Sequence, residues 1–559
     1  MPTPLSTGPS EQLIKSKSLL KQIIEDRILL HQGPKAEIKA PGGKSSLWIF
    51  DFRAVALNSQ FLDIFSEIFF ENFGDLYPFQ VGGMETAAIP LITSLVLKGK
   101  QISKPISGVY IRKSKKKYDL MKQIEGELTN EPMILIDDLI NSGRSLLRQV
   151  EILEQHQITV AAVFVIVQFR PLISYSYFET KKIPVRAIFN LSDFGLQLGE
   201  DKDLTVSTFR SVWKIQSEGA DLSYVASKST PTIHDGLVYL PKDNGVIEAR
   251  AKDTGALRWR FTCGLFPKGK HVNPTPHIYK EILYFSTTTG TLYALHTKTG
   301  DKLWSLSEAD RITSSVISIP SHNLVCLGVT YSKPYFKGAI EAFDPTSGKK
   351  NWMYQTSAAV GSTPLYVREI DAVIAGDFEG VVHCVSAKNG FLRWSYTTSS
   401  SIKGAPVLSP SNEEVFIPTL DGNVYALSVR TGQLTHRFLV GEPVVSTPLV
   451  LGNRLVISCL DKNIYCFDTE TEKEIWRFST KGRVFSTPTE FNGKIYVGSN
   501  DGSLYELDSI SGKETGFFQT TERITGQVVP DPSTGLLYIP TFTNGLYCLE
   551  PADETPPFV

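Results

Sequence analysis

The sequence predicts a multidomain protein in which an α/β domain, a parallel sheet flanked by helices, precedes an all-β propeller of eight blades. Helical and strand patterns alternate from residue 12 to residue 200, as they do in α/β domains. Most of the remaining sequence repeats one unit of short strands every 40 to 48 residues, which is typical of a propeller. We expect a flexible N-terminus over 1–11, the α/β domain over 12–200, a linker over 201–210 and the propeller over 211–555.

Composition narrows the class of protein. Lys and Arg number 57 against 58 Asp and Glu, so net charge gives no support for bulk binding to nucleic acid or membranes. We find no run of about 18 apolar residues and no apolar core of a secretory signal at the N-terminus. The six cysteines are scattered, without a CxxC or an adjacent pair, so neither a zinc site nor a redox motif is predicted. We therefore expect reduced thiols and a cytoplasmic location.

Residues 133–145, MILIDDLINSGRS, are the segment that says most about function. Four apolar residues, the carboxylates Asp137 and Asp138, and a small polar loop precede an apolar-periodic stretch, which predicts a buried strand, a tight turn and a helix. The start of such a helix suits a phosphate, because backbone N–H groups and the positive end of the helix dipole point there. Carboxylates at the carboxyl end of the strand can accept hydrogen bonds from sugar hydroxyls. An ordinary strand, loop and helix with a solvated acidic turn is the alternative.

The segment resembles the PRPP-binding motif of type I phosphoribosyltransferases. That resemblance implies the family's α/β fold for the N-terminal domain. It also implies that Asp137 and Asp138 hold the ribose hydroxyls of PRPP and that the loop after them binds the 5-phosphate. The loop residues are Asn141, Ser142, Gly143, Arg144 and Ser145. Asn141 stands where the family usually has Thr, and Arg144 stands where the family usually has a small residue.

Two further segments resemble orotate phosphoribosyltransferases in particular. LWIFDFRAV, residues 47–55, resembles the segment of those enzymes that ends in Asp-x-Arg. PFQVGGMETAAIPLITSLVLKG, residues 78–99, resembles their strand, pyrophosphate loop and adjoining helix, which implies diphosphate contacts from Gly83, Glu85 and Thr86. Such loops can turn backbone N–H groups toward an anion. A plain strand, turn and helix is the alternative for residues 78–99.

Residues 110–126, YIRKSKKKYDLMKQIEG, resemble the mobile catalytic loop of the same enzymes. Arg112, Lys113 and Lys116 fall on its basic positions, and the resemblance implies catalytic roles for Arg112 and Lys116 together with Asp138. Cations that close over a departing diphosphate stabilise its charge and exclude water. A solvated charge run is the alternative. The place of the run between the two other motifs, in family order, favours the catalytic loop.

The base is expected to bind between Asn141 and Arg170. Arg170 ends the apolar run VFVIVQFR, where the family has an arginine that contacts orotate. An Arg fork suits a planar carboxylate such as orotate, whereas a surface Arg at a strand end is the alternative. Ala87 and Pro41 stand where the family has lysines, and these departures bear on the base more than on PRPP.

The leading hypothesis is Mg²⁺-dependent transfer of a phosphoribosyl group from PRPP to a nucleobase, with orotate as the first choice. Mg²⁺ would arrive with PRPP and take few protein ligands, so no metal-ligating residue is predicted. A non-catalytic PRPP or nucleotide sensor, with the propeller as its output to a protein partner, is the alternative. A transferase that acts on another base is a third hypothesis. The family implies a possible homodimer through this domain.

The C-terminal repeats resemble the PQQ-like propeller family. One Trp recurs at the same point of the unit, at Trp259, Trp304, Trp352, Trp394 and Trp476, and His436 takes that place once. The last unit ends without its fourth strand, which the stretch around Trp213 can supply, so that eight blades, with seven as the alternative, close one ring. We expect each Trp to pack between blades rather than to stack on a quinone. The expectation is a docking scaffold without PQQ.

Overall fold

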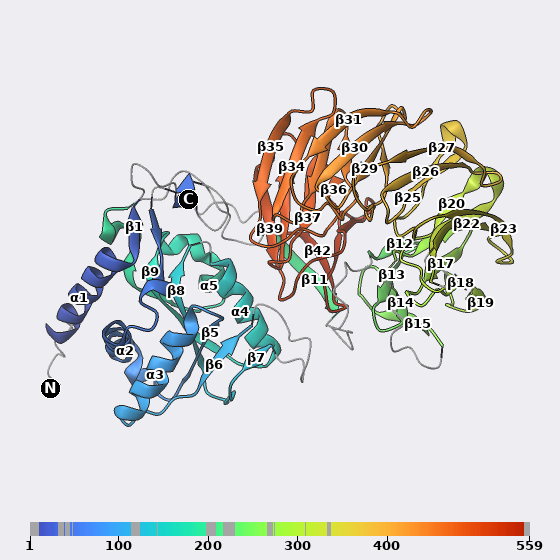
Figure 1. Ribbon diagram of the computed structural model, residues 1–559. Helices are drawn as coiled ribbons and strands as arrows, with labels where there is room; N and C mark the ends of the chain where they lie inside the picture. The colour runs from blue at the N-terminus through green and yellow to red at the C-terminus, as the bar shows by residue number, and fades with distance from the viewer. Residues whose placement is uncertain are drawn as a thin grey trace. The chain divides into compact units, whose positions relative to one another are not determined.

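The computed structural model describes residues 11–31, 38–39, 45–46, 48–112, 123–141, 143–196, 208–215, 230–264, 272, 274–307, 309–332 and 337–552. The chain forms two compact units, Met1–Ser207 and Thr208–Val559 (Figure 1). Most of the expected flexible N-terminus and of the expected linker lies outside the described residues. No helix in the described part of the chain is long and apolar enough to cross a membrane.

The first unit is built on a six-stranded sheet (Figure 1). Neighbouring strands are parallel throughout, except that the last pair is antiparallel. In spatial order the strands are β10 (Val185–Asn190), β9 (Val160–Gln168), β8 (Met133–Ile140), β5 (Gln80–Met84), β6 (Gly108–Ile111) and β7 (Ile124–Glu125). Two small antiparallel pairs join β1 (Leu29–His31) to β4 (Trp48–Phe50) and β2 (Ile38–Lys39) to β3 (Ser45–Ser46).

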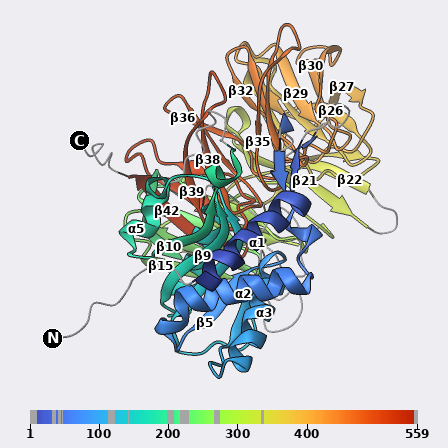
Figure 2. The same ribbon diagram turned by 90° about the vertical axis from the view of Figure 1, so that its left-hand side faces the viewer.

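Helices cover both faces of this sheet. One face carries α1 (Glu11–Arg27), α2 (Ser59–Phe73) and α3 (Ala88–Gln101), which Figure 2 shows lying together. The other face carries α4 (Arg144–Gln155) and α5 (Ser176–Thr180). Short 3₁₀ turns complete the unit: η1 (Phe52–Ala54), η2 (Gly74–Leu76), η3 (Leu172–Tyr175) and η4 (Leu191–Phe194).

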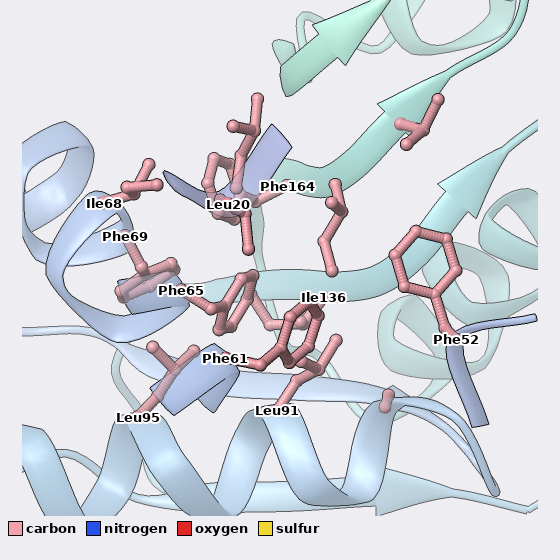
Figure 3. Close-up of a cluster of buried hydrophobic side chains, with 14 of the residues drawn as sticks. Leu20, Phe52, Phe61, Phe65, Ile68, Phe69, Leu91, Leu95, Ile136 and Phe164 are labelled. Carbon is pink, nitrogen blue, oxygen red and sulfur yellow. The ribbon is translucent and has the colours of Figure 1, made fainter. Parts of the chain in front are cut away.

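The core of the first face is aromatic. Phe61, Phe65 and Phe69 recur along α2 at helical spacing and are buried against Phe164 of β9 and Ile136 of β8 (Figure 3). Residues of β8 alternate between the two cores, so that Ile134 and Ile136 join the aromatic one and Met133 and Leu135 join the other. A strand buried on both faces explains the continuous apolar run that precedes Asp137.

Among the described residues, the second unit forms eight four-stranded antiparallel sheets, the blades of a propeller. Blade 1 has β12 (Thr232–His234), β13 (Leu237–Lys242), β14 (Val246–Ala251) and β15 (Leu257–Thr262); blade 2 has β16 (His277–Tyr279), β17 (Ile282–Ser286), β18 (Leu292–His296) and β19 (Lys302–Leu306). Blade 3 has β20 (Ile317–Ile319), β21 (Leu324–Tyr331), β22 (Lys337–Phe343) and β23 (Lys350–Thr356); blade 4 has β24 (Leu365–Val367), β25 (Ala372–Gly376), β26 (Val381–Ser386) and β27 (Leu392–Thr397).

The remaining blades repeat the pattern. Blade 5 has β28 (Val407–Leu408), β29 (Glu414–Pro418), β30 (Asn423–Ser428) and β31 (Leu434–Leu439); blade 6 has β32 (Leu449–Leu451), β33 (Arg454–Ser458), β34 (Asn463–Asp468) and β35 (Glu474–Ser479). Blade 7 has β36 (Thr489–Phe491), β37 (Lys494–Gly498), β38 (Ser503–Asp508) and β39 (Glu514–Gln519); blade 8 has β40 (Val529–Pro530), β41 (Leu537–Pro540), β42 (Leu546–Pro551) and β11 (Phe209–Ile215).

Blade 8 closes the ring with strands from both ends of the unit. β11 pairs antiparallel with β42, and Trp213 lies opposite Cys548. The prediction of eight blades, one of them shared by both ends, is therefore confirmed. β11 begins at Phe209, inside the stretch expected as linker, because its first residues already pair with Glu550 and Pro551.

The recurring tryptophans pack between blades, as predicted. Each ring lies against a turn glycine of the next blade, where an added Cβ would fall between 2.4 and 2.9 Å from ring atoms. The pairs are Trp213 with Gly255, Trp259 with Gly300, Trp304 with Gly348, Trp352 with Gly390, Trp394 with Gly432 and Trp476 with Gly512. At the fifth blade, His436 replaces Trp and Glu472 replaces Gly, and the two side chains meet with Nδ1 3.1 Å from Oε1. The contact between blades thus persists with different chemistry.

Candidate functional site

The strand order puts a topological switch point at the carboxyl ends of β5 and β8, the position where open α/β sheets form a crevice. From β5 the chain passes through α3 to β6 on one side, and from β8 it passes through α4 to β9 on the other side. Open α/β sheets bind ligands where neighbouring strands lead away in opposite directions in this manner. The loops after β5 and β8 flank this point and carry most of the predicted site residues.

Asp137 and Asp138 lie in the last part of β8, toward the crevice. Both are half-buried. The backbone N–H of Asp138 donates to Oδ1 of Asp137 at 3.0 Å, and the N–H of Leu139 donates to Oδ1 of Asp138 at 2.8 Å. Burial raises the pKa of the Asp138 carboxyl, and the nearby Asp51 carboxylate raises this pKa further. The strand therefore presents two neighbouring carboxyl groups, and Asp138 holds its proton more strongly than an ordinary Asp does.

Asp51 is a site neighbour that the sequence prediction did not include. It comes directly after β4 and caps η1, and its Oδ1 accepts from Nε of Arg53 at 2.7 Å. The signal for it was the Asp-x-Arg of residues 51–53, which we assigned only as a resemblance. The effect of Asp51 on Asp138 is a contact between segments far apart in sequence, so local patterns do not predict it.

The loop after β8 starts helix α4 as predicted. Gly143 is the residue before the helix and has a left-handed backbone with φ of 74°. An added Cβ would lie 3.3 Å from Phe178 and 3.4 Å from Tyr175, so these two rings pack closely against the loop. Ser145 is exposed, whereas the Arg144 side chain is only 6 % exposed. Ser142 lies outside the described residues.

Asn141 and Arg170, the two residues predicted to bind the base, are brought together. Arg170 Nε donates to Oδ1 of Asn141 at 3.0 Å, from the ends of β9 and β8 respectively. This contact uses only the Nε–H of the guanidinium. The four N–H groups on Nη1 and Nη2 point in other directions, because the guanidinium is planar and rigid. The contact joins the predicted base end of the site to the first residue of the predicted phosphate loop.

The predicted pyrophosphate loop is shorter than the sequence suggested. Gly83 lies inside β5 rather than in a loop. An added Cβ there would lie 2.4 Å from Cβ of Ala88 and 2.5 Å from the carbonyl oxygen of Ile136, so the glycine allows β5, β8 and α3 to approach. The loop itself begins at Glu85, and the peptide bond between Glu85 and Thr86 is cis.

Arg112 lies at the end of β6 beside this loop. Its Nε lies 3.0 Å from Oε1 of Glu125, and its Nη1 lies 3.9 Å from Oε2 of Glu85. The hydrogen bond with Glu125 raises the pKa of Arg112. Lys113 and Lys116, the other basic residues predicted for the catalytic loop, lie outside the described residues. Within the described ranges, no group of three or more His, Cys, Asp or Glu side chains is arranged to hold a metal ion.

Comparison with known proteins identifies the N-terminal region. The orotate phosphoribosyltransferase of Rhodopseudomonas palustris (strain TIE-1) is 23% identical over 184 residues, which are 32% of this chain and 98% of that protein. The orotate phosphoribosyltransferase of Pyrococcus abyssi (strain GE5 / Orsay) is 32% identical over 129 residues, 22% of this chain and 68% of that protein. Through its N-terminal region, the chain belongs to the orotate phosphoribosyltransferase family.

The second unit of this family member is an eight-bladed β-propeller. The family described as beta-alanine-activating enzyme, beta-propeller, matches residues 296–527. Among solved structures, BamB from Moraxella catarrhalis is 17% identical with a TM-score of 0.50, and the match covers 63% of this chain and 99% of that protein. A likeness at this identity establishes the fold of the propeller. The chain thus joins an orotate phosphoribosyltransferase-like domain to an eight-bladed propeller.

Proposed function

We propose that the N-terminal domain transfers the 5-phosphoribosyl group of PRPP to a nucleobase, with orotate as the first candidate. The observation that carries the proposal is the placement of four elements at the carboxyl ends of the neighbouring strands β6, β5, β8 and β9. These elements are the carboxylates of β8, the glycine turn that starts α4, the Arg170–Asn141 pair and the Arg112–Glu85 pair. Site residues rather than the fold decide function, and this combination offers acceptors for a sugar and donors for a phosphate and a base.

In this reaction Asp137 and Asp138 accept hydrogen bonds from the ribose hydroxyls of PRPP. The first turn of α4 directs N–H groups and the positive end of its dipole toward the 5-phosphate. Arg170, held by Asn141, orients the base at the far end of the crevice. A base nitrogen then attacks C1 of the ribose while the bond from C1 to the diphosphate oxygen breaks. Positioning and charge stabilisation supply most of the rate enhancement.

Arg112 stabilises the departing diphosphate. It faces the pyrophosphate loop through Glu85 and is held by Glu125, so a small side-chain movement brings the guanidinium to an anion bound there. Lys113 and Lys116 add charge from the same segment. Mg²⁺ would arrive with PRPP and offset the charge of the diphosphate, and it would take few protein ligands.

A PRPP sensor is the second candidate, and one observation favours it. Ala87 and Ala88 occupy the positions after Thr86, so the loop lacks the lysine expected in a transferase of this kind. A sensor keeps the phosphate and ribose contacts and loses turnover. In either case we propose that the propeller is a docking scaffold for a protein partner and that the protein acts in the cytoplasm.

The test is loss of orotate absorbance by the purified chain with PRPP and Mg²⁺. The control is the double variant Asp137→Asn/Asp138→Asn, which removes both carboxylate charges without changing side-chain size. We expect turnover in the wild type and none in the variant. If PRPP stabilises the wild type against heat but no base is turned over, the sensor hypothesis replaces the transferase hypothesis. If the wild type shows neither turnover nor stabilisation by PRPP, both hypotheses are refuted.

A further inference from the structure

Tyr175 contacts the base end and the phosphate end of the crevice at once. It ends η3, next to α5, and its side chain is only 2 % exposed. The hydroxyl donates to the carbonyl oxygen of Ile140 at 3.1 Å and accepts from the backbone N–H of Arg170 at 3.2 Å. Its ring lies against the phosphate loop, where Cδ1 is 3.4 Å from the place of a Cβ on Gly143. One side chain thus touches three parts of the site.

These contacts hold the ends of β8 and β9 together. The carbonyl of Ile140 also accepts from the N–H of Phe169 at 2.9 Å, so two donors, Phe169 and the Tyr175 hydroxyl, converge on the last residue of β8. The carbonyl of Arg170 accepts from Nε2 of Gln168 at 2.7 Å. With the side-chain contact to Asn141, the arginine is fixed through its N–H, its carbonyl and its guanidinium.

The hydroxyl is a permanent donor. Burial raises the pKa of Tyr175 to about 12, so the group keeps its proton throughout the working range of the protein. Loss of the hydroxyl would leave the N–H of the half-buried Arg170 without this acceptor, and an unsatisfied donor away from water costs more than the net value of an ordinary hydrogen bond. The segment PLISYSYFE, which follows Arg170, belongs to none of the motifs that indicated the family.

We propose that Tyr175 is a positioning residue that sets Arg170 for the base and links that setting to the phosphate loop. The inference rests on the proposed function, because it assigns Arg170 to the base. A ligand that fixes the loop around Gly143 also fixes the ring of Tyr175, and through the hydroxyl it fixes the backbone of Arg170. Such a link is reciprocal, so bound PRPP strengthens base binding and bound base strengthens PRPP binding.

The test compares Tyr175→Phe with Tyr177→Phe in the full-length chain. Tyr177 is a half-buried tyrosine two residues away, and its hydroxyl takes part in no hydrogen bond of the described residues that involves the site. Calorimetry gives the Kd for PRPP alone, and steady-state rates give kcat and the KM for orotate. We expect Tyr175→Phe to raise the KM for orotate about 5- to 10-fold and to leave the Kd for PRPP alone within about twofold.

Three results would count against Tyr175 as a positioning residue. An unchanged KM for orotate in Tyr175→Phe would show that the hydroxyl does not position Arg170 for the base. An equal loss in PRPP affinity and in base affinity would mean a general structural role, and so would the same change in Tyr177→Phe. A wild type that turns over no base at all would instead overturn the proposed function, and the inference with it, so the two failures are distinguishable in the wild-type measurement.

Discussion

Single side chains set the chemistry of the crevice through neighbours that are distant in sequence. Asp138 lies on β8, yet part of its pKa shift comes from Asp51, directly after β4. The hydrogen bond from Arg53 lowers the pKa of Asp51, so Asp51 carries a negative charge, and that charge disfavours ionisation of Asp138. A residue far away in the sequence therefore contributes to the proton affinity of Asp138, the carboxyl group for which we propose a contact with the ribose.

We predict that Asp51→Asn moves the acid limb of kcat/KM for PRPP to lower pH. Removal of the negative charge at residue 51 lowers the raised pKa of Asp138, so that the carboxylate forms at lower pH. Asn can still accept the N–H of Arg53 and cap η1. The measurement is a pH profile of kcat/KM. The control is Asp63→Asn, an exposed partner of Lys98, and a limb that stays in place in both variants would contradict the prediction.

Gly143 gives a second prediction at this scale. Gly143→Ala adds a Cβ that crowds Tyr175 and Phe178 at a left-handed position. Gly195→Ala has a similar φ of 67° and nothing within 4 Å, so it reproduces the backbone strain alone. We expect both variants to lose about 1 kcal/mol of stability, and only Gly143→Ala to weaken PRPP binding in calorimetry. Equal PRPP affinity in the two variants would show that the packing against the loop does not matter.

At the scale of elements, the propeller is held by one contact repeated between neighbouring blades. The Trp of one blade covers a turn glycine of the next, and the indole N–H donates to a backbone carbonyl there. These hydrogen bonds run from Trp213 to Lys252, Trp259 to Thr297, Trp304 to Pro345, Trp352 to Ala387 and Trp394 to Val429, at 2.8 to 3.1 Å. Repeat proteins distribute their stability over such nearest-neighbour contacts.

Gly432→Ala tests this contact. Its Cβ would lie 2.5 Å from Cε3 of Trp394, whereas Gly493→Ala, also at positive φ, meets nothing within 4 Å. We expect about 1 kcal/mol of destabilisation for Gly493→Ala from the backbone alone and about 2 to 4 kcal/mol for Gly432→Ala from the added clash. Urea unfolding followed by tryptophan fluorescence measures both. Similar losses in the two variants would argue against the packing account.

Periodic and contiguous features were predictable from the sequence, and contacts between distant segments were not. The blade count derives from a repeat, and the β8–loop–α4 unit derives from one unbroken run of thirteen residues. The position of Gly83 inside β5 was missed because a Gly-Gly pair suggests a loop, whereas here it permits close packing. Tyr175, Asp51 and the carboxylate partners of Arg112 depend on tertiary contacts that no local pattern encodes.

At the scale of the whole second unit, ring closure depends on polar contacts between blades 8 and 1. Lys252 Nζ lies 2.8 Å from Oδ2 of Asp531, and Asn544 Nδ2 donates to Oδ1 of Asp243 at 2.6 Å. Although burial raises its pKa, hydrogen bonds from Lys252, Ser533 and Thr534 hold the pKa of Asp531 well below its usual range. Closure thus joins the first and last blades through a charged pair as well as through β11.

We predict that Asp531→Asn destabilises the propeller in a pH-dependent way. A carboxyl with a lowered folded pKa stabilises the fold above its unfolded pKa of about 4, and that stability is lost as pH falls toward the folded value. We expect a loss of about 1 to 3 kcal/mol at pH 7, which shrinks as pH falls below about 4. Chemical unfolding at several pH values measures this difference. Asp253→Asn, an exposed neighbour of Lys252, is the control, and a pH-independent difference would contradict the assignment.

The most direct test of the central claim is the product of the reaction. The full-length chain is incubated with PRPP, Mg²⁺ and a panel of bases that includes orotate, and nucleotide and pyrophosphate are measured by mass spectrometry and a coupled assay. If the domain transfers phosphoribosyl groups, a nucleoside 5′-monophosphate and pyrophosphate form in equal amounts, and neither forms with Asp137→Asn/Asp138→Asn. Wild-type protein that binds PRPP and forms no nucleotide from any base would contradict phosphoribosyl transfer.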